Sequence, residues 1–365
     1  MKISDIIEVL ENFAPTIYQE NYDNAGLIVG NPDWDCNSIL LAMDVTGSII
    51  EEAMNKKANL IVAHHPVIFQ GLKKISERNY NGKAIVSAIK ADIAIYAIHT
   101  NLDNILKGVN GKIAQKLGLV NTRPLSPSAN SLRKLFTFVP TEHTEKVRSA
   151  LFNAGAGHIG NYSETSFGAA GIGTFKGGEG TNPFVGSLGK RHEEKENRIE
   201  VIFPMHLQKA VVQALLDNHP YEEVAYDIIS LSNDSKDIGS GIIGDLPQTI
   251  SESAFLSMLK EEFKLQVIRH SPLLNRPVNK IALCGGAGSF LISKALSAGA
   301  QFFLSADFKY HEFFDANDKM VIADLGHYES EQFTIDLLDE VLREKFPTFA
   351  VLKPDTITNP VNYYF

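Results

Sequence analysis

Residues 59–66 read NLIVAHHP, a short apolar run that ends in two adjacent histidines. An uninterrupted apolar run of this length is typical of a parallel strand that is buried on both faces of a sheet. Polar residues just beyond the carboxyl end of such a strand lie where open α/β sheets bind their ligands. The stretch therefore predicts an α/β fold and places His64 and His65 in a candidate site.

Similar apolar runs recur in both halves of the chain. Strands are expected in the first half at 38–43, 60–63 and 93–98, and in the second half at 280–284, 301–304 and 320–323. Amphipathic stretches predict helices near them, at 1–12, 47–57, 83–90, 289–298 and 310–317. The alternation predicts an internal duplication of a β-α unit in one sheet, although any α/β chain shows some alternation of this kind.

The middle of the chain has a different order of elements. Polar, linker-like runs at 125–131 and 232–240 bound it, and a glycine-rich stretch at 168–189 is expected to be a long loop. Strands are expected at 132–140, 160–166, 197–204 and 223–231, with helices at 142–154 and 207–218. This order predicts a ferredoxin-like split unit. We therefore expect a discontinuous α/β core, residues 1–128 and 237–365, interrupted by an inserted domain at 129–236.

The composition is that of a globular protein. Of 365 residues, 44% are hydrophobic and 21% are charged, and the formal net charge is -9. The acidic balance argues against non-specific binding to nucleic acid. Two cysteines exclude a disulfide framework or a cysteine zinc site, and they fit a reducing cytoplasm. We find no signal peptide and no apolar stretch of membrane-spanning length, so we expect a cytoplasmic protein without a membrane partner.

Five imidazole and carboxylate side chains follow the predicted strands: His64, His65, Asp103, His327 and Glu331. We expect all five at one edge of one sheet. Such a donor set is the kind that zinc, iron or manganese selects. Five donors are generous for one ion, and a carboxylate can bridge, so two ions about 3.5–4 Å apart are the better fit. The alternative interpretation is a set of ordinary structural or exposed histidines.

The spacing of the residues within each pair determines whether both side chains can bind the same ion. His327 and Glu331 lie one turn apart if that segment is helical. Adjacent residues of an extended strand point to opposite faces, so His64 and His65 bind together only if the chain bends. Pro66 favours such a bend. Alternatively, each histidine serves a different metal.

Weaker candidates lie nearby in the sequence. His99 and His311 are candidate general acid or base residues, because imidazole titrates near neutrality, and packing is the alternative role for each. Asp307 is a candidate to orient a ligand histidine. The run Gly285–Ser289 either holds an anion through its N–H groups or forms a tight turn.

Several motifs occur together and in order: 22–27 (YDNAGL), 63–66 (AHHP), 99–103 (HTNLD), 307–311 (DFKYH) and 326–331 (GHYESE). In them the chain resembles the GTP cyclohydrolase I type 2 family, also called the Ngg-interacting-factor-three-like family. The middle, with 155–157 and 219–223, is similar to the PII/CutA-like inserted domain of the long bacterial members. Two departures are Tyr22, where a tryptophan is common, and Thr165, where a cysteine is frequent.

The resemblance implies a two-metal centre held by those same five residues and a toroidal homohexamer. It also implies a hydrolase of the GTP cyclohydrolase type that opens the guanine ring at C8 with release of formate. The expected substrate is a nucleotide or a related small molecule. A phosphoester or an amide would also suit the same centre. The alternative is a non-catalytic metal-binding or regulatory protein, whose inserted domain senses a small molecule or binds a partner.

Overall fold

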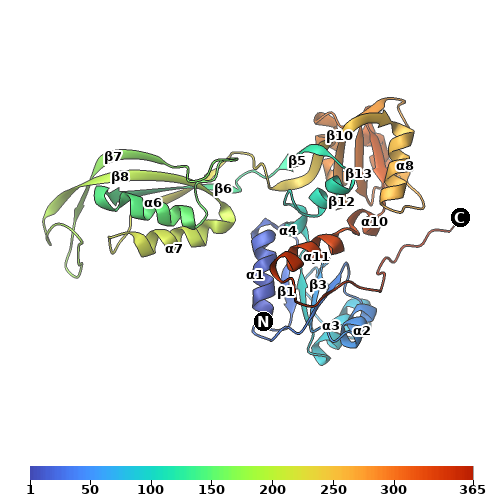
Figure 1. The fold of residues 1–365 in the computed structure, drawn as a ribbon, viewed down its shortest axis with the longest axis horizontal. Coiled ribbons are helices and arrows are strands. Elements are labelled where there is room, and N and C mark those ends of the chain that lie inside the picture. Colours follow the sequence, from blue (N-terminus) through green and yellow to red (C-terminus); the bar gives the residue numbers. More distant parts are fainter. Residues whose placement is uncertain (365) are drawn as a thin grey trace. The chain divides into compact units, whose positions relative to one another are not determined.

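The structure, a computed structural model, describes residues 1–364. The chain divides into two compact units, one of residues 1–127 and 236–365 and the other of residues 128–235 (Figure 1). Within the described residues, no helix combines the length and the apolar character needed to cross a membrane. The candidate residues for metal binding all belong to the larger unit.

The first sheet of the larger unit has the strand order β1-β4-β3-β2-β15. Its strands are Gly26–Val29 (β1), Ile39–Ala42 (β2), Leu60–Ala63 (β3), Ala94–Ala97 (β4) and Val351–Leu352 (β15). Strands β2, β3 and β4 run parallel and every residue in them is buried, as their apolar runs predict. Helices α2 (Gly47–Asn55) and α3 (Tyr80–Lys90) share one apolar core with this sheet.

The second sheet has the strand order β11-β14-β13-β12-β10-β5. Its strands are Val120–Pro127 (β5), Gly239–Ser251 (β10), Arg269–His270 (β11), Pro277–Ala287 (β12), Phe302–Ala306 (β13) and Val321–Asp324 (β14). Strands β12, β13 and β14 are parallel, as expected. Around them lie α8 (Glu252–Glu262), α9 (Ile292–Ser297) and the 3₁₀ segments η4 (Ser289–Leu291) and η5 (Tyr310–Ala316). The segment expected to be a helix at 310–317 is thus a 3₁₀ helix.

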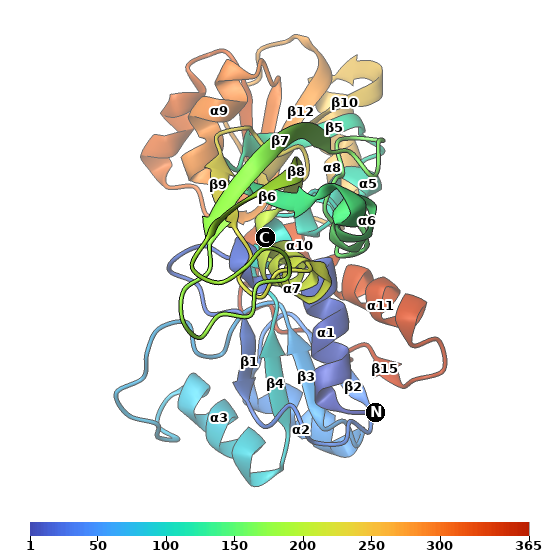
Figure 2. The same ribbon diagram turned by 90° about the vertical axis from the view of Figure 1, so that its left-hand side faces the viewer.

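The expectation that the two repeats form one sheet is wrong. Figure 2 shows them as separate sheets, with α10 (His327–Glu331) between them. Each set of three parallel strands is completed by strands from elsewhere in the chain. Strands β1 and β15 flank the first set, and β11 and β10 flank the second. Because these added strands take up the hydrogen-bonding edges, the two sets cannot pair with each other.

The remaining helices of the larger unit lie outside these sheets. They are α1 (Ile3–Phe13), η1 (Thr16–Tyr18), α4 (Thr100–Asp103), α5 (Val109–Lys116) and α11 (Thr334–Lys345). Helices α4 and α10 each begin just after a strand, β4 and β14 respectively, and α10 contacts β12 and α5. After α11 the chain returns to the first sheet, where β15 pairs in parallel with β2. The C-terminal half therefore supplies one strand to the N-terminal sheet.

The smaller unit is a four-stranded antiparallel sheet in the order β7-β8-β6-β9. Its elements are Leu132–Pro140 (β6), Thr141–His143 (η2), Thr144–Asn153 (α6), Phe167–Lys176 (β7), Arg191–Pro204 (β8), Met205–Leu207 (η3), Gln208–Asn218 (α7) and Tyr226–Leu231 (β9). Helices α6 and α7 share an apolar core with one face of this sheet. Figure 1 shows both helices on the same side of the strands.

Two predictions in the smaller unit are wrong. The strand expected at 160–166 does not form, and the first part of the expected loop at 168–189 is strand β7. This edge strand is rich in glycine and alanine and largely exposed, so it carries no apolar periodicity that a sequence pattern would detect. Its hydrogen bonds to β8, which begins at Arg191, hold it in place. The charged residues 191–195 are part of β8.

Candidate metal centre

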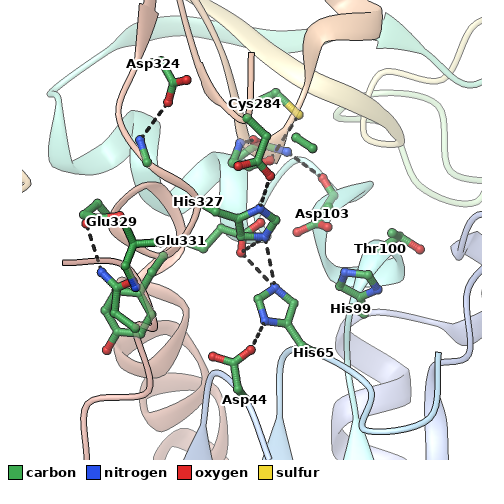
Figure 3. A pocket seen from close by; sticks show the side chains of 18 of the residues that line it. Asp44, His65, His99, Thr100, Asp103, Cys284, Asp324, His327, Glu329 and Glu331 are labelled. Atoms are coloured by element: carbon green, nitrogen blue, oxygen red, sulfur yellow. Dashed lines mark hydrogen bonds and ion pairs between the residues drawn. The ribbon is translucent and has the colours of Figure 1, made fainter. Parts of the chain in front are cut away.

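The five predicted metal-binding side chains lie together in the larger unit. Figure 3 shows four of them, His65, Asp103, His327 and Glu331. His64 and His65 follow β3 directly, and Asp103 is the last residue of α4. His327 and Glu331 are the first and last residues of α10. The sheets are different, but their carboxyl ends face the same region, and that is why residues more than 200 positions apart in the sequence meet.

Glu331 lies at the centre of the cluster. Its Oε2 is 3.1 Å from Nε2 of His65 and 3.2 Å from Nε2 of His327, the residue one helical turn before it. The same oxygen is 3.8 Å from Nε2 of His64. The side chain is only 3% exposed. One carboxylate oxygen therefore faces three imidazole nitrogens, and the chain bends at His64 and His65 so that both rings reach it.

Two buried polar atoms in the cluster have no hydrogen-bond partner within residues 1–364. They are Nε2 of His64 and Oδ1 of Asp103, which lie 3.7 Å apart. His64 is completely buried, and its Nδ1 is 2.9 Å from the carbonyl oxygen of Ile98, so Nδ1 carries the proton and Nε2 has a free lone pair. Unpartnered buried polar atoms are costly. A cation between these atoms would satisfy both, so the residues present fit a bound metal ion.

Other carboxylates orient the two remaining histidines. Asp44 Oδ1 is 2.8 Å from Nδ1 of His65, and Asp307 Oδ2 is 2.7 Å from Nδ1 of His327. Each carboxylate accepts the Nδ1 proton and so directs Nε2 toward Glu331. The position of Asp307 is the one that the sequence predicts for an orienting residue. Asp44 was not predicted; the only signal for it is its place just beyond the end of β2, as His64 stands beyond β3.

The glycine-rich end of β12 shapes the cluster from the other side. The N–H of Gly285 donates to Oδ1 of Asn110, and the N–H of Gly286 donates to Oγ of Ser330. Both N–H groups are therefore occupied, which favours the turn over the anion site. Gly286 has φ +61°, and a Cβ there would collide with the Glu331 carboxylate. The irregular end of β12 needs glycine at this position for both reasons.

His99 lies at the edge of the same cluster, whereas His311 does not. The ring of His99 is 5.3 Å from that of His64, and its Nδ1 is 2.7 Å from Oδ1 of Asp23. Burial alone would raise the pKa of Asp23, but hydrogen bonds from His99 and Thr100 outweigh burial and lower it to about 2. Asp23 is therefore ionised, and Nδ1 of His99 donates to it. His311 is in η5 and its ring contacts Tyr310 and Phe314, so its position gives its catalytic role no support.

The electrostatics of the cluster favour positive charge at its centre. Burial would lower the pKa of His65 and of His327, but hydrogen bonds to carboxylates raise these values to about 10 and about 9. Burial, together with the nearby charge of Glu331, raises the pKa of Asp103 well above its usual range. In the absence of a cation, protons on the histidines balance the carboxylates. Metal binding exchanges such protons for the ion.

A cavity of about 800 Å³ opens onto these side chains. Its wall includes the aromatic rings of Tyr22, Phe69, Tyr80 and Phe290. The volume is within the range of small-molecule sites. The cluster is therefore accessible to a substrate of nucleotide size or smaller.

The C-terminal segment, residues 353–364, forms part of this wall. Thr358 Oγ1 donates to Oδ2 of Asp44 at 2.7 Å, which ties the segment to the carboxylate that orients His65. Nearer its start, Glu52 accepts hydrogen bonds from the N–H groups of Asp355 and Thr356. Burial would raise the pKa of Glu52, but hydrogen bonds from Lys56 and from these residues lower it to about 2. The sequence pattern did not predict a role for this segment.

The larger unit is a two-sheet α/β fold with a cluster of histidine and carboxylate side chains that could hold a metal ion. Comparison with known proteins places it more narrowly. The family described as Duf34/NIF3 (NGG1p interacting factor 3) matches residues 1–360. The chain belongs to this family, as the motifs at 63–66 and 326–331 predict.

Relatives and solved structures agree with this assignment. The GTP cyclohydrolase 1 type 2 homolog of Bacillus subtilis is 37% identical over 98% of this chain and 97% of its own. The protein of the same name from Halalkalibacterium halodurans is 38% identical over the whole of both chains. A Bacillus cereus protein related to NIF3 is similar in structure, with a TM-score of 0.87, 36% identity, and coverage of 100% of this chain and 99% of that one.

Proposed function

We propose that the protein binds two divalent metal ions and uses them to hydrolyse a small molecule. The observation that carries the proposal is the pair of buried, unpartnered atoms, Nε2 of His64 and Oδ1 of Asp103, beside the oxygen of Glu331 that faces three imidazoles. His64, Asp103 and Glu331 form one candidate group for an ion, and His65, His327 and Glu331 form another. Glu331 belongs to both groups, so it would serve as a donor to both ions.

The chemistry of the site follows from its donors. Divalent ions at such a centre polarise an electrophilic group and make water a nucleophile near neutral pH. Imidazole and carboxylate donors suit zinc, and they suit iron or manganese as well. Asp44 and Asp307 hold His65 and His327 in the tautomer that keeps Nε2 free. His99 also lies within reach of His64 and His65.

His99 is the residue best placed to move a proton. Ionised Asp23 fixes its Nδ1 proton, so its other nitrogen, Nε2, is free to accept or donate a proton. The residue lines the cavity beside Asp103. We therefore assign His99 as the general acid or base of the proposed reaction.

The relatives are named as homologs of GTP cyclohydrolase 1 type 2, and we propose a reaction of that hydrolytic class. The aromatic rings in the cavity wall suit a flat heterocycle, which supports a nucleotide or a related small molecule as substrate. The second candidate function, a metal-binding or regulatory protein without catalysis, is the other outcome of the experiment below.

The test compares purified, metal-replete wild-type protein with Glu331→Ala, His65→Ala, His99→Ala and His311→Ala. Metal content is measured by elemental analysis, and turnover is measured with GTP and with a panel of phosphoesters and amides. We expect about two ions per chain in the wild type and a loss of metal in the first two variants. We expect His99→Ala to keep its metal and to lose turnover, while His311→Ala resembles the wild type.

Two results would count against the proposal in different ways. Well under one ion per chain after reconstitution contradicts the metal site itself. Full metal content with no turnover above the Glu331→Ala background contradicts catalysis and leaves the regulatory function.

We further propose that residues 129–236 are an inserted ferredoxin-like domain of the PII/CutA-like kind. The order β6-α6-β7-β8-α7-β9 and the strand order β7-β8-β6-β9 support the ferredoxin-like assignment. The compact units, 1–127 with 236–365 and 128–235, support boundaries within one residue of those expected. A homohexamer is proposed from the family resemblance, and light scattering on the purified protein tests it.

A further inference from the structure

A second cavity lies wholly within the smaller unit, and no function is assigned to it. Its volume is about 640 Å³, which is within the range of small-molecule sites. Phe138 and Glu196 line it, and they alternate along β6 and β8 with Val139 and Ile199, which belong to the core shared with α6 and α7. The cavity is therefore on the face of the sheet away from these helices.

Aromatic rings form much of its wall. The ring centroid of Tyr221 is 5.9 Å from that of Phe175 and 6.3 Å from that of Phe184. Tyr221 is held in place by its backbone N–H, which donates to Nδ1 of His219, while Nε2 of that histidine donates to the carbonyl oxygen of Phe138. These hydrogen bonds fix the position of Tyr221, against which the rings of Phe175 and Phe184 lie.

A buried carboxylate faces this wall. Glu196 is only 8% exposed, and the Tyr221 hydroxyl donates to its Oε1 at 2.8 Å. The carboxylate packs over Gly173, where a Cβ would lie 2.1 Å from its Oε2. A carboxylate that is largely buried is stabilised by a cation placed beside it.

The protein's own cations do not neutralise this carboxylate. Arg198, two residues after Glu196 on the same face of β8, is 3.0 Å from Glu200 and lies over the ring of Phe136 at 4.5 Å. Lys176 is an exposed residue at the end of β7. Glu222 and Glu223 also line the cavity, so acidic side chains outnumber the basic ones there.

We propose that this cavity binds a small organic ammonium ion. Its charge would pair with Glu196, and its carbon substituents would lie against Phe175, Phe184 and Tyr221. Aromatic faces attract ammonium groups through the ring quadrupole, and a carboxylate beside them adds the direct charge pair. The site is independent of the metal cluster, because none of its lining residues belongs to the larger unit.

The test is calorimetric titration of the full-length protein with matched pairs of probes. Choline is compared with 3,3-dimethylbutan-1-ol, which has the same shape without the charge, and benzylamine is compared with benzyl alcohol. We expect at least one cation to bind at least about tenfold more tightly than its neutral counterpart.

Two variants in β8 test whether Glu196 is responsible for the affinity for the cation. Glu196→Gln keeps the size of the side chain and an acceptor for Tyr221, and we expect it to lose at least about tenfold in affinity for the cation. Glu194→Gln removes a carboxylate that pairs with His192 and does not line the cavity, and we expect it to bind as the wild type does.

Three results would overturn the proposal: no binding of either cation, equal binding of the neutral probes, or unchanged binding by Glu196→Gln. The comparison of charged and neutral probes needs only the wild-type protein, so the proposal can be refuted even if the variant does not fold.

Discussion

Replacing Asp44 by asparagine should weaken metal binding without removing any proposed ligand. Asp44 accepts the Nδ1 proton of His65 at 2.8 Å and a hydrogen bond from Thr358 at 2.7 Å. Asparagine retains the shape and one acceptor oxygen, but it loses the negative charge. His65 then becomes less basic at Nε2 and less firmly oriented.

The magnitude follows from the exposure of the pair. A hydrogen bond to a charged group contributes about 1.5–3 kcal/mol. The Asp44 side chain is 35% exposed and that of His65 is 22% exposed, so solvent weakens the interaction and the lower part of that range applies. We expect a loss of about 1.5–2 kcal/mol, which is about twelve- to thirtyfold in metal affinity.

The assay is competition between the metal-free protein and a chromogenic zinc chelator at fixed pH. Thr358→Val removes only the outer hydroxyl and should cost less than about fivefold, because Asp44 keeps its charge. His311→Ala, in η5, serves as the unaffected control. An Asp44→Asn variant that binds zinc within about twofold of the wild type would refute the reasoning. A loss of more than about fivefold in Thr358→Val would refute it as well.

Three further predictions concern stability and domain structure. The Glu52 carboxylate has a pKa of about 2 against an ordinary value of 4.5. It should therefore stabilise the fold above pH 4.5 and lose this effect as the pH falls toward 2. The difference in Tm between wild type and Glu52→Gln should shrink on acidification. Gly286→Ala should destabilise the protein by about 1–2 kcal/mol from the left-handed backbone alone, and it should displace Glu331 with loss of metal. Gly299→Ala, at φ +75° with no atom within 4 Å of the added carbon, should keep its metal. Denaturant unfolding and elemental analysis check both variants. Deleting residues 129–236 should leave a folded, metal-binding core, because Pro127 and Gly239 pair across β5 and β10; an insoluble, metal-free product would contradict it.

The parallel strands could be predicted from the sequence because burial on both faces leaves a continuous apolar run. The residues of β2, β3 and β4 are all buried, and the runs at 39–42, 60–63 and 94–97 are visible without any structure. Strand β7 could not be predicted in this way. It is an exposed edge strand of small residues, and it is held by main-chain hydrogen bonds to β8, which leave no trace in side-chain pattern.

In the histidine and carboxylate cluster, too, only some residues could be predicted from the sequence. Residues that stand just beyond strand ends, such as His64 and His327, could be found from position and residue type. Asp44 and Asp23 are single acidic residues in the sequence. Only the tertiary arrangement shows that Asp44 contacts His65 and that Asp23 contacts His99. The assignment of all candidates to one sheet failed because strand pairing between distant segments, as of β15 with β2, is not encoded in local periodicity.

The long separation between the two halves of the cluster has a consequence for biosynthesis. His65 and Glu331 are 266 positions apart and face each other, and the chain leaves the ribosome N-terminus first at about 5–20 residues per second. His64, His65 and Asp103 are therefore synthesised many seconds before α10 exists. A nascent chain offers incoming ions only an incomplete set of donors, and the full site forms after α10 has emerged. Metal binding at the proposed site would thus be a late event, and a chain truncated before α10 should not hold the ions.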